Sequence, residues 1–209
     1  MFICAGRNEN IGCATPIGVG LIESAIGLTN LILKQKIENL IFVGSAGAYS
    51  KEIPLFSLHC SINSCNIENG FLNESCYTPL DNFINLDSSF LEFYLDNFPH
   101  IAELNENLNI KNLKIINEKA NKVSQETSRT ICVNSSNYIT TDSILSNRYF
   151  NAGIHLENME FFSVLSVTKE FKIPTFGIFC VSNYCDENAH KDFLKNHNKV
   201  KEILQKVCV

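Results

Sequence analysis

The pattern of apolar and polar residues predicts strands that alternate with helices along most of the chain. Two short apolar runs, at residues 2–5 and 11–14, flank the polar turn at 6–10, which indicates two strands joined as a hairpin. Apolar residues then recur at helical spacing through 21–33. The wholly apolar run at 40–43 follows, as in a strand that is covered on both faces.

The same alternation returns near the C-terminus, after a long stretch with little signal at residues 68–128. The expected elements are an extended region at 55–67, a helix near 87–97, a strand at 130–133, helices at 142–150 and 159–171, a buried strand at 173–181 and a helix at 193–207. This order favours an α/β fold with three layers, αβα, around a mixed and largely parallel central sheet. Its functional site is expected at the carboxyl ends of the strands.

Composition narrows the class of protein. The chain has 209 residues, and because domains usually hold about 100–200 residues, we expect one domain over 1–209. A net charge of −5 argues against a protein that binds nucleic acid through its backbone. The sequence has no apolar run long enough to cross a membrane and no pattern of a signal peptide at its start, so we expect a cytoplasmic protein.

The nine cysteines are odd in number and scattered, and no CxxC motif occurs. Four residues separate the members of the two closest pairs, Cys60 with Cys65 and Cys180 with Cys185. Several cysteines lie inside apolar runs, where a reduced thiol acts as a small apolar side chain. We therefore expect buried free thiols and no metal, while zinc binding or disulfides remain alternatives.

Three segments that follow predicted strands have residue types suited to chemistry. Residues 44–47, Gly-Ser-Ala-Gly, would let the backbone turn sharply and approach an anion or a water molecule, although such residues also form ordinary turns. Residues 157–160, Glu-Asn-Met-Glu, place carboxylates at the start of a helix. There a carboxylate can bind a diol or simply interact with the helix dipole. Residues 182–187 form a polar cluster, either a site or a surface loop.

Taken together, these motifs resemble those of the purine nucleoside phosphorylase and methylthioadenosine/S-adenosylhomocysteine nucleosidase superfamily. The order is Gly44-Ser45-Ala46-Gly47, then Asn158-Met159-Glu160, then Ser182-Asn183. Members of the superfamily have a Gly-Ser-Ala/Cys-Gly turn, a Glu-Met-Glu helix start, and a Ser-Asp or Ser/Thr-Asn strand end. Three separated motifs in the right order are far more specific than any one of them.

The resemblance implies a role for each matching residue. Ser45 would contact phosphate or the attacking water, Glu160 would bind the ribose hydroxyls, and Asn183 would engage the purine. Met159 would lie under the ribose, and Tyr138 would stack on the base. The remaining residues that the motifs place in the substrate site are Gly18, Gly47, Asn158 and Ser182.

The chemistry that the resemblance implies is cleavage of the N-glycosidic bond of a purine nucleoside by phosphate, giving the free base and ribose 1-phosphate. This is a transferase of purine salvage that needs no cofactor and uses phosphate as its co-substrate. Asn183 cannot act as a general acid, but its amide can exchange hydrogen bonds with a purine carbonyl, which favours 6-oxopurines. Asp186, three residues further on, is an alternative group at the base.

Two departures from the family pattern weaken the phosphate site. Phosphorolysing relatives commonly have an Arg just before the Gly-Ser turn, where this chain has Phe42. The N-terminus also looks shortened by a strand–helix unit, which in relatives brings a Gly turn and an Arg, or in nucleosidases a Glu that activates water. Arg7 could bind phosphate in a neighbouring subunit, or be a simple turn residue.

Three further hypotheses concern the type of activity, the histidines and the oligomeric state. The alternatives to a phosphorylase are a phosphate-independent nucleosidase and a nucleoside-binding relative without activity. His59 and His155 are expected to be structural, because a lone histidine in an apolar strand usually is. Because relatives form dimers, trimers or hexamers, the resemblance also implies a homo-oligomer.

Overall fold

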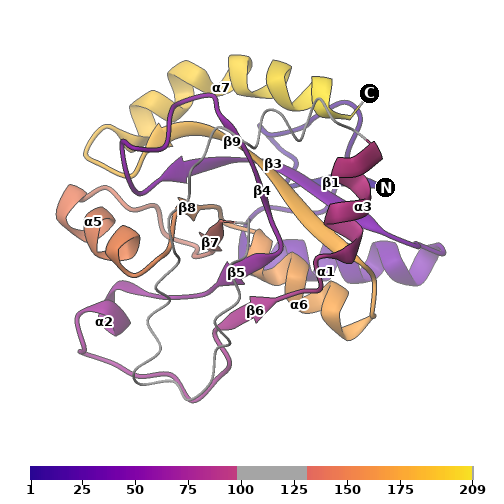
Figure 1. The fold of residues 1–209 in the computed structure, drawn as a ribbon, viewed down its shortest axis with the longest axis horizontal. Coiled ribbons are helices and arrows are strands. Elements are labelled where there is room, and N and C mark those ends of the chain that lie inside the picture. Colours follow the sequence, from indigo (N-terminus) through magenta and orange to yellow (C-terminus); the bar gives the residue numbers. More distant parts are fainter. Residues whose placement is uncertain (98–130, 209) are drawn as a thin grey trace.

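The computed structural model describes residues 1–97 and 131–208, and Figure 1 shows their layers. Helices α1 (Gly20–Lys34) and α6 (Phe161–Glu170) pack together on one face of the central sheet. Helices α7 (Ala189–Val207) and α3 (Ser89–Asn97) cover the other face. The expected αβα arrangement is confirmed.

The described strands form one sheet around two long parallel strands, β3 (Leu40–Ala48) and β9 (Thr175–Tyr184). Alternate side chains of β3 enter opposite cores: Phe42 packs on the α1–α6 side, and Ile41 and Val43 pack on the α7 side. Burial on both faces explains why this strand is a continuous apolar run in the sequence.

The expected N-terminal hairpin is wrong. Strand β1 (Phe2–Cys4) pairs in parallel with β2 (Thr15–Pro16), and residues 11–14 form no strand. Ile11 and Ala14 instead pack into the core beneath α7. The chain therefore makes a loop at the end of β1, and the apolar residues of that loop are buried by a helix rather than paired in the sheet.

The Gly-Ser-Ala-Gly segment is also not a turn, because β3 continues through it to Ala48. A bulge follows Ala46, where the register with β9 shifts. A Cβ on Gly47 would lie 2.8 Å from Cys185 Sγ and 3.1 Å from Asn183 Nδ2. The absence of a side chain on Gly47 thus leaves room for Asn183 near the end of β9 and for Cys185 just after it.

The other elements follow the predicted order, with α2 and β6 as additions that the sequence pattern does not indicate. They are β4 (Leu58–Ser61), β5 (Asn63–Cys65), α2 (Asn69–Leu72), β6 (Phe83–Asn85), β7 (Cys132–Asn134), α5 (Ser143–Asn151) and β8 (Leu156–Glu157). The parallel pairs are β1–β2, β1–β3, β3–β9, β5–β7 and β7–β8, and the antiparallel pairs are β3–β8, β4–β9 and β5–β6. Residues 98–128 of the uninformative stretch lie outside the described residues.

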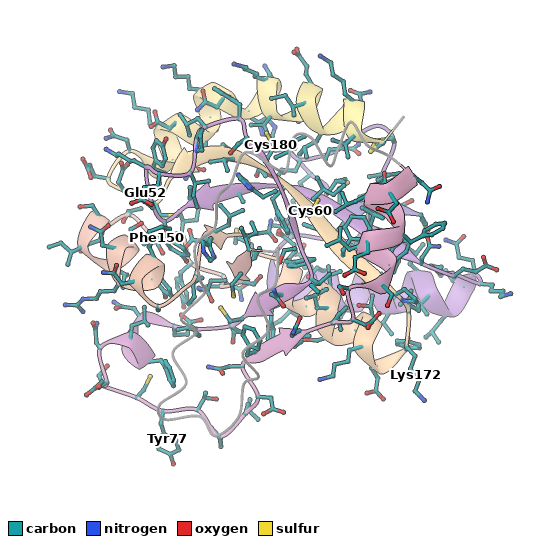
Figure 2. All side chains as sticks on the ribbon, viewed as in Figure 1. Glu52, Cys60, Tyr77, Phe150, Lys172 and Cys180 are labelled. Atoms are coloured by element: carbon teal, nitrogen blue, oxygen red, sulfur yellow. A yellow bond between two sulfur atoms is a disulfide. The ribbon has the colours of Figure 1, made fainter. Side chains whose placement is uncertain are left out.

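The cysteines only partly match the expected free thiols. Cys60 and Cys180, labelled in Figure 2, are buried on the paired strands β4 and β9, and neither is in a disulfide. Cys13 and Cys208, however, form a disulfide that joins the N-terminal loop to the end of α7. Because 195 residues separate the two cysteines, local spacing in the sequence does not indicate this pairing. None of the helices in the described part of the chain has the length and apolar character needed to cross a membrane.

Candidate active site

A cavity of about 310 Å³ opens where β1, β3 and β9 end. Its walls come from residues 5–9 after β1, 45–47 of β3, 157–160 between β8 and α6, 182–183 of β9, and the first turn of α7. The three main strands are parallel, so their carboxyl ends meet at one edge of the sheet and bring these distant segments together.

Most of the predicted site residues line this cavity. They are Arg7, Ser45, Gly47, Asn158, Met159, Glu160, Ser182 and Asn183. The motifs of the sequence analysis therefore form one site. Their roles toward a ligand remain predictions.

Gly18 and Tyr138 do not line the cavity. Gly18 lies in the turn before α1 with φ +117°, and a Cβ there would lie 2.8 Å from the backbone of Glu23. It shapes the turn rather than the wall. The Tyr138 side chain is 75% exposed, because its backbone N–H donates to Ser136 Oγ in a loop that turns the ring outward. The next residue, Ile139, lines the cavity instead.

Glu160 is the most constrained acidic group of the site. Its carboxylate accepts a hydrogen bond from Gly20 N at 2.9 Å, and its side chain is almost fully buried. Burial, together with the nearby charge of Glu9, raises the pKa of Glu160 to about 8. Asn158 fixes this segment: Oδ1 accepts from Glu160 N and Phe161 N, while Nδ2 donates to Ser45 O at 3.1 Å.

Glu9 is a site residue that the sequence analysis did not identify. Its carboxylate accepts a hydrogen bond from Ser45 Oγ inside the cavity, and burial raises its pKa. The loop positions it by a tight turn in which Glu9 N donates to Gly6 O at 3.0 Å and Arg7 adopts φ 52°. The signal in the sequence was a polar run directly after a strand. Because residues 6–10 were interpreted as the turn of a hairpin, Glu9 was not expected to lie at the site.

The loop at residues 6–9 bears on the expectation that a strand–helix unit is missing. In relatives, that unit brings a Gly turn and an Arg, or in nucleosidases a Glu, so the resemblance implies that this chain lacks them. In the structure, Gly6, Arg7 and Glu9 all line the cavity. This chain therefore presents the same residue types at the site from a short loop.

Asn183 retains part of its hydrogen-bonding capacity. Its Oδ1 accepts from Ser182 Oγ at 2.7 Å, and its Nδ2 donates to Tyr184 O at 3.0 Å. An amide has two donor hydrogens and two acceptor lone pairs, so one of each remains for a ligand. Asp186, the alternative, does not line this cavity: its carboxylate accepts from Asn188 N at 2.9 Å and lies 4.0 Å from Lys51 Nζ.

The guanidinium group of Arg7 at the site is already paired with a carboxylate. Arg7 Nη2 donates to both carboxylate oxygens of Glu23, at 2.6 and 2.8 Å, in an exposed ion pair. Phe42, the residue where relatives commonly have Arg, is fully buried against Phe161 and Phe179. Binding of phosphate to Arg7 in a neighbouring subunit stays a prediction.

The histidines divide into two groups. His59 and His155 are buried away from the cavity, and burial lowers the pKa of each to about 4. His155 Nδ1 accepts from Cys132 N, as expected for a structural residue. His190, in contrast, is exposed on the first turn of α7 and lines the same cavity as Asn183.

A comparison with models of protein families shows the family to which this chain belongs. The family model of the Phosphorylase superfamily matches residues 9–209. The chain belongs to the Phosphorylase superfamily. None of the curated protein sequences is similar enough to this superfamily member to count as a match.

Solved structures share its fold at low sequence identity. Futalosine hydrolase of Helicobacter pylori superposes with a TM-score of 0.73 at 16% identity, over 98% of this chain and 93% of that one. The 5′-methylthioadenosine/S-adenosylhomocysteine nucleosidase of Helicobacter pylori gives 0.72 at 15%, over 98% and 93%. The S-adenosylhomocysteine nucleosidase of Streptococcus pyogenes gives 0.63 at 14%, over 90% and 75%.

Proposed function

We propose that this superfamily member is a nucleosidase that cleaves the N-glycosidic bond of a purine nucleoside with water. The observation that carries the proposal is the Glu9 carboxylate bound to Ser45 Oγ, in the same cavity as Glu160. In nucleosidases of the superfamily, a Glu activates water, and Glu9 is placed to do so. The structures named above, two nucleosidases and a hydrolase, add support through their shared fold.

Electrostatics favour water over phosphate as the nucleophile. A phosphate at Ser45 would lie among two carboxyl groups, Glu9 and Glu160. Among the described residues that line the cavity, Arg7 has the one guanidinium or ammonium group, and Glu23 already pairs with it. An anion needs a compensating charge in such a partly buried site, whereas a neutral water does not. Phosphorolysis remains the second candidate, because Ser45 keeps the position of the serine that contacts phosphate in the family.

The groups around the sugar suit a cationic transition state. As the bond to the base breaks, positive charge develops on the ribose. Glu160 would accept from the ribose hydroxyls, and Met159 would lie under the ring. Glu9 would take one proton from the water that attacks C1′, with Ser45 orienting that water. Carboxylates fixed around a developing cation are an effective form of electrostatic stabilisation.

Asn183 sets the expected substrate class. Its free donor and free acceptor match a purine that presents both a carbonyl oxygen and a ring N–H. A 6-oxopurine nucleoside such as inosine or guanosine fits this pattern better than adenosine.

A direct assay separates the candidates. The purified chain is incubated with inosine, guanosine, adenosine or methylthioadenosine in ¹⁸O-labelled water, with and without phosphate. We expect free base without phosphate and ¹⁸O in the released sugar. Base release that requires phosphate and gives a sugar 1-phosphate would overturn the proposal. Thermal stabilisation by a nucleoside without turnover would identify a binding protein instead.

Substitutions at the two acidic residues test their roles. Glu9→Gln should lower kcat by about 10²–10⁴-fold, the usual contribution of a general base, with a smaller change in KM. Glu160→Ala should abolish turnover and leave the fold intact by circular dichroism. Glu52→Gln, a change on an exposed loop away from the cavity, is the matched control. Retained activity in Glu160→Ala would remove that residue from the site.

A further inference from the structure

Cleavage of the N-glycosidic bond leaves an electron pair on the purine, and a proton delivered to the ring makes the purine a better leaving group. Asn183 lies where the resemblance places the group that engages the base, but a carboxamide does not release a proton near neutral pH. An acid that can do so must come from elsewhere in the cavity. This inference rests on the proposed function, because it concerns the acid that the proposed hydrolysis requires.

Glu157 lines the cavity but is committed as an acceptor. Thr140 N donates to Oε1 at 3.0 Å, and Tyr49 OH donates to Oε2 at 2.9 Å. The Thr140 hydroxyl donates to Oε2 as well. Burial raises the pKa of Glu157, while each of these bonds favours its ionised form, and both of its carboxylate oxygens are already engaged as acceptors within the fold.

The remaining acidic groups lie elsewhere or have other partners. Glu160 is bound to Gly20 N, and Glu9 is bound to Ser45 Oγ on β3. Asp186 lines a separate cavity, formed by the ends of β3 and β9 and by α5. Of these three groups, Glu160 and Glu9 line the same cavity as Asn183, and Asp186 does not.

His190 lies on the first turn of α7, seven residues after Asn183. Ala189 and Phe193, on either side of it in the helix, line the same cavity as Asn183. Asn196 Nδ2 donates to Ser182 O at 2.7 Å, which holds the helix against the end of β9. His190 thus lines the cavity from a helix that is held against the end of β9, and it is exposed.

We propose that His190 is the general acid that protonates the departing purine. The bond between C1′ and the ring nitrogen breaks, and its electron pair moves to the purine. The imidazolium of His190 gives its proton to the purine and becomes neutral. Water adds to C1′ and gives a proton to Glu9, and exchange with solvent then returns one proton to His190 and removes one from Glu9. Atoms and charges balance without a further reactant.

The charges around His190 come from the cavity wall and from its own helix. They are Arg7, Glu9, Glu157 and Glu160 on the wall, and Asp186, Glu187, Lys191 and Asp192 along the chain. Acidic groups outnumber basic ones in this set.

The test uses two kinds of leaving group. His190→Gln should lower kcat on inosine or guanosine by about 10²–10⁴-fold. It should change cleavage of 4-nitrophenyl riboside little, because nitrophenolate leaves without a proton. The alkaline fall in kcat of the wild type should also disappear in the variant. Lys191→Gln, the next residue on the helix and outside the cavity wall, should behave as wild type.

Two outcomes would overturn the role of His190. An equal loss on both substrates indicates a structural role, and undiminished cleavage of the nucleoside indicates none. His190→Ala with added imidazole gives a second measurement, since a missing acid should be restored by free imidazole and a disturbed fold should not. If the wild type instead needs phosphate for base release, the proposed hydrolysis fails while the His190 comparison still stands, because the purine leaves in both reactions.

Discussion

At the scale of single residues, the main feature is that Glu9 makes Glu160 harder to ionise. The carboxyl groups face one cavity, and the charge of Glu9 adds to burial in raising the pKa of Glu160. Such a pair holds one proton more readily than either group would alone. The charge of Glu9 therefore disfavours ionisation of Glu160.

Glu9→Gln should therefore lower the pKa of Glu160 from about 8. The pKa should stay above its ordinary value of 4.5, because burial is the larger cause and persists. Titration of ¹³C-labelled glutamate carboxyl groups by NMR measures the shift. Glu52→Gln should leave the Glu160 titration unchanged. An unchanged pKa in Glu9→Gln would contradict the coupling.

The same residues show what local sequence can predict. Ser45, Glu160 and Asn183 were identified because each stands in a motif next to a strand end. Glu9 was missed because its contact with Ser45 depends on the parallel pairing of β1 with β3, which no short pattern encodes. The role of Tyr138 stays a prediction: its neighbours match a motif, but the residue is 75% exposed and does not line the cavity.

At the scale of elements, the loop between β1 and β2 is held by α7 at two points. His197 Nε2 lies 2.6 Å from Asn8 O, and Cys13 is bonded to Cys208. Glu9 lies between the two residues that make these contacts. The helix that contributes His190 to the cavity thus also fixes the loop that contributes Glu9.

Cys13→Ser should lower the free energy of unfolding by about 2–5 kcal/mol in non-reducing buffer, the usual effect of losing a native disulfide. Chemical denaturation measures it. We also expect a lower kcat, because the Glu9 loop loses one of its two attachments. Cys76→Ser, at an exposed free thiol, is the control and should change neither value. Equal stability of wild type and Cys13→Ser in that buffer would contradict the prediction.

Helices were the more predictable elements, since their apolar spacing survives in the sequence. The strand status of residues 44–47 was not predictable. Glycines usually indicate a turn, but Gly44 and Gly47 are required here by the side chains of Phe42, Cys185 and Asn183 that pack against them. The contacts of Gly47 with Cys185 and Asn183 join segments that are distant in the sequence, so no local pattern indicates them.

At the scale of the whole molecule, His59 and His155 make stability depend on pH. Each has a pKa of about 4 in the fold and an ordinary value of 6.5. Between these values the unfolded chain binds more protons than the folded one. The free energy of unfolding therefore contains a contribution that falls as the pH drops from 6.5 toward 4.

The size of this contribution is about 1.4 kcal/mol per pH unit for each histidine. His155→Gln should remove one of the two, so its stability should fall less steeply than that of wild type over this range. Denaturation curves at several pH values measure the two slopes. His59→Gln is the second variant, used if the first is too unstable to fold. Parallel slopes for wild type and variant would show that the histidine does not titrate on unfolding.

The disulfide also determines how the molecule would carry a mechanical load. It joins Cys13 to Cys208 and so closes nearly the whole fold into a covalent ring. A force applied to the two ends of the oxidised chain passes through residues 1–13 and that bond, so it acts directly on β1 and the Glu9 loop and bypasses the chain between Cys13 and Cys208. Once the bond is reduced, the same force also acts on α7 and on the elements before it. Extension under load would then report the thiol state of a single cysteine pair.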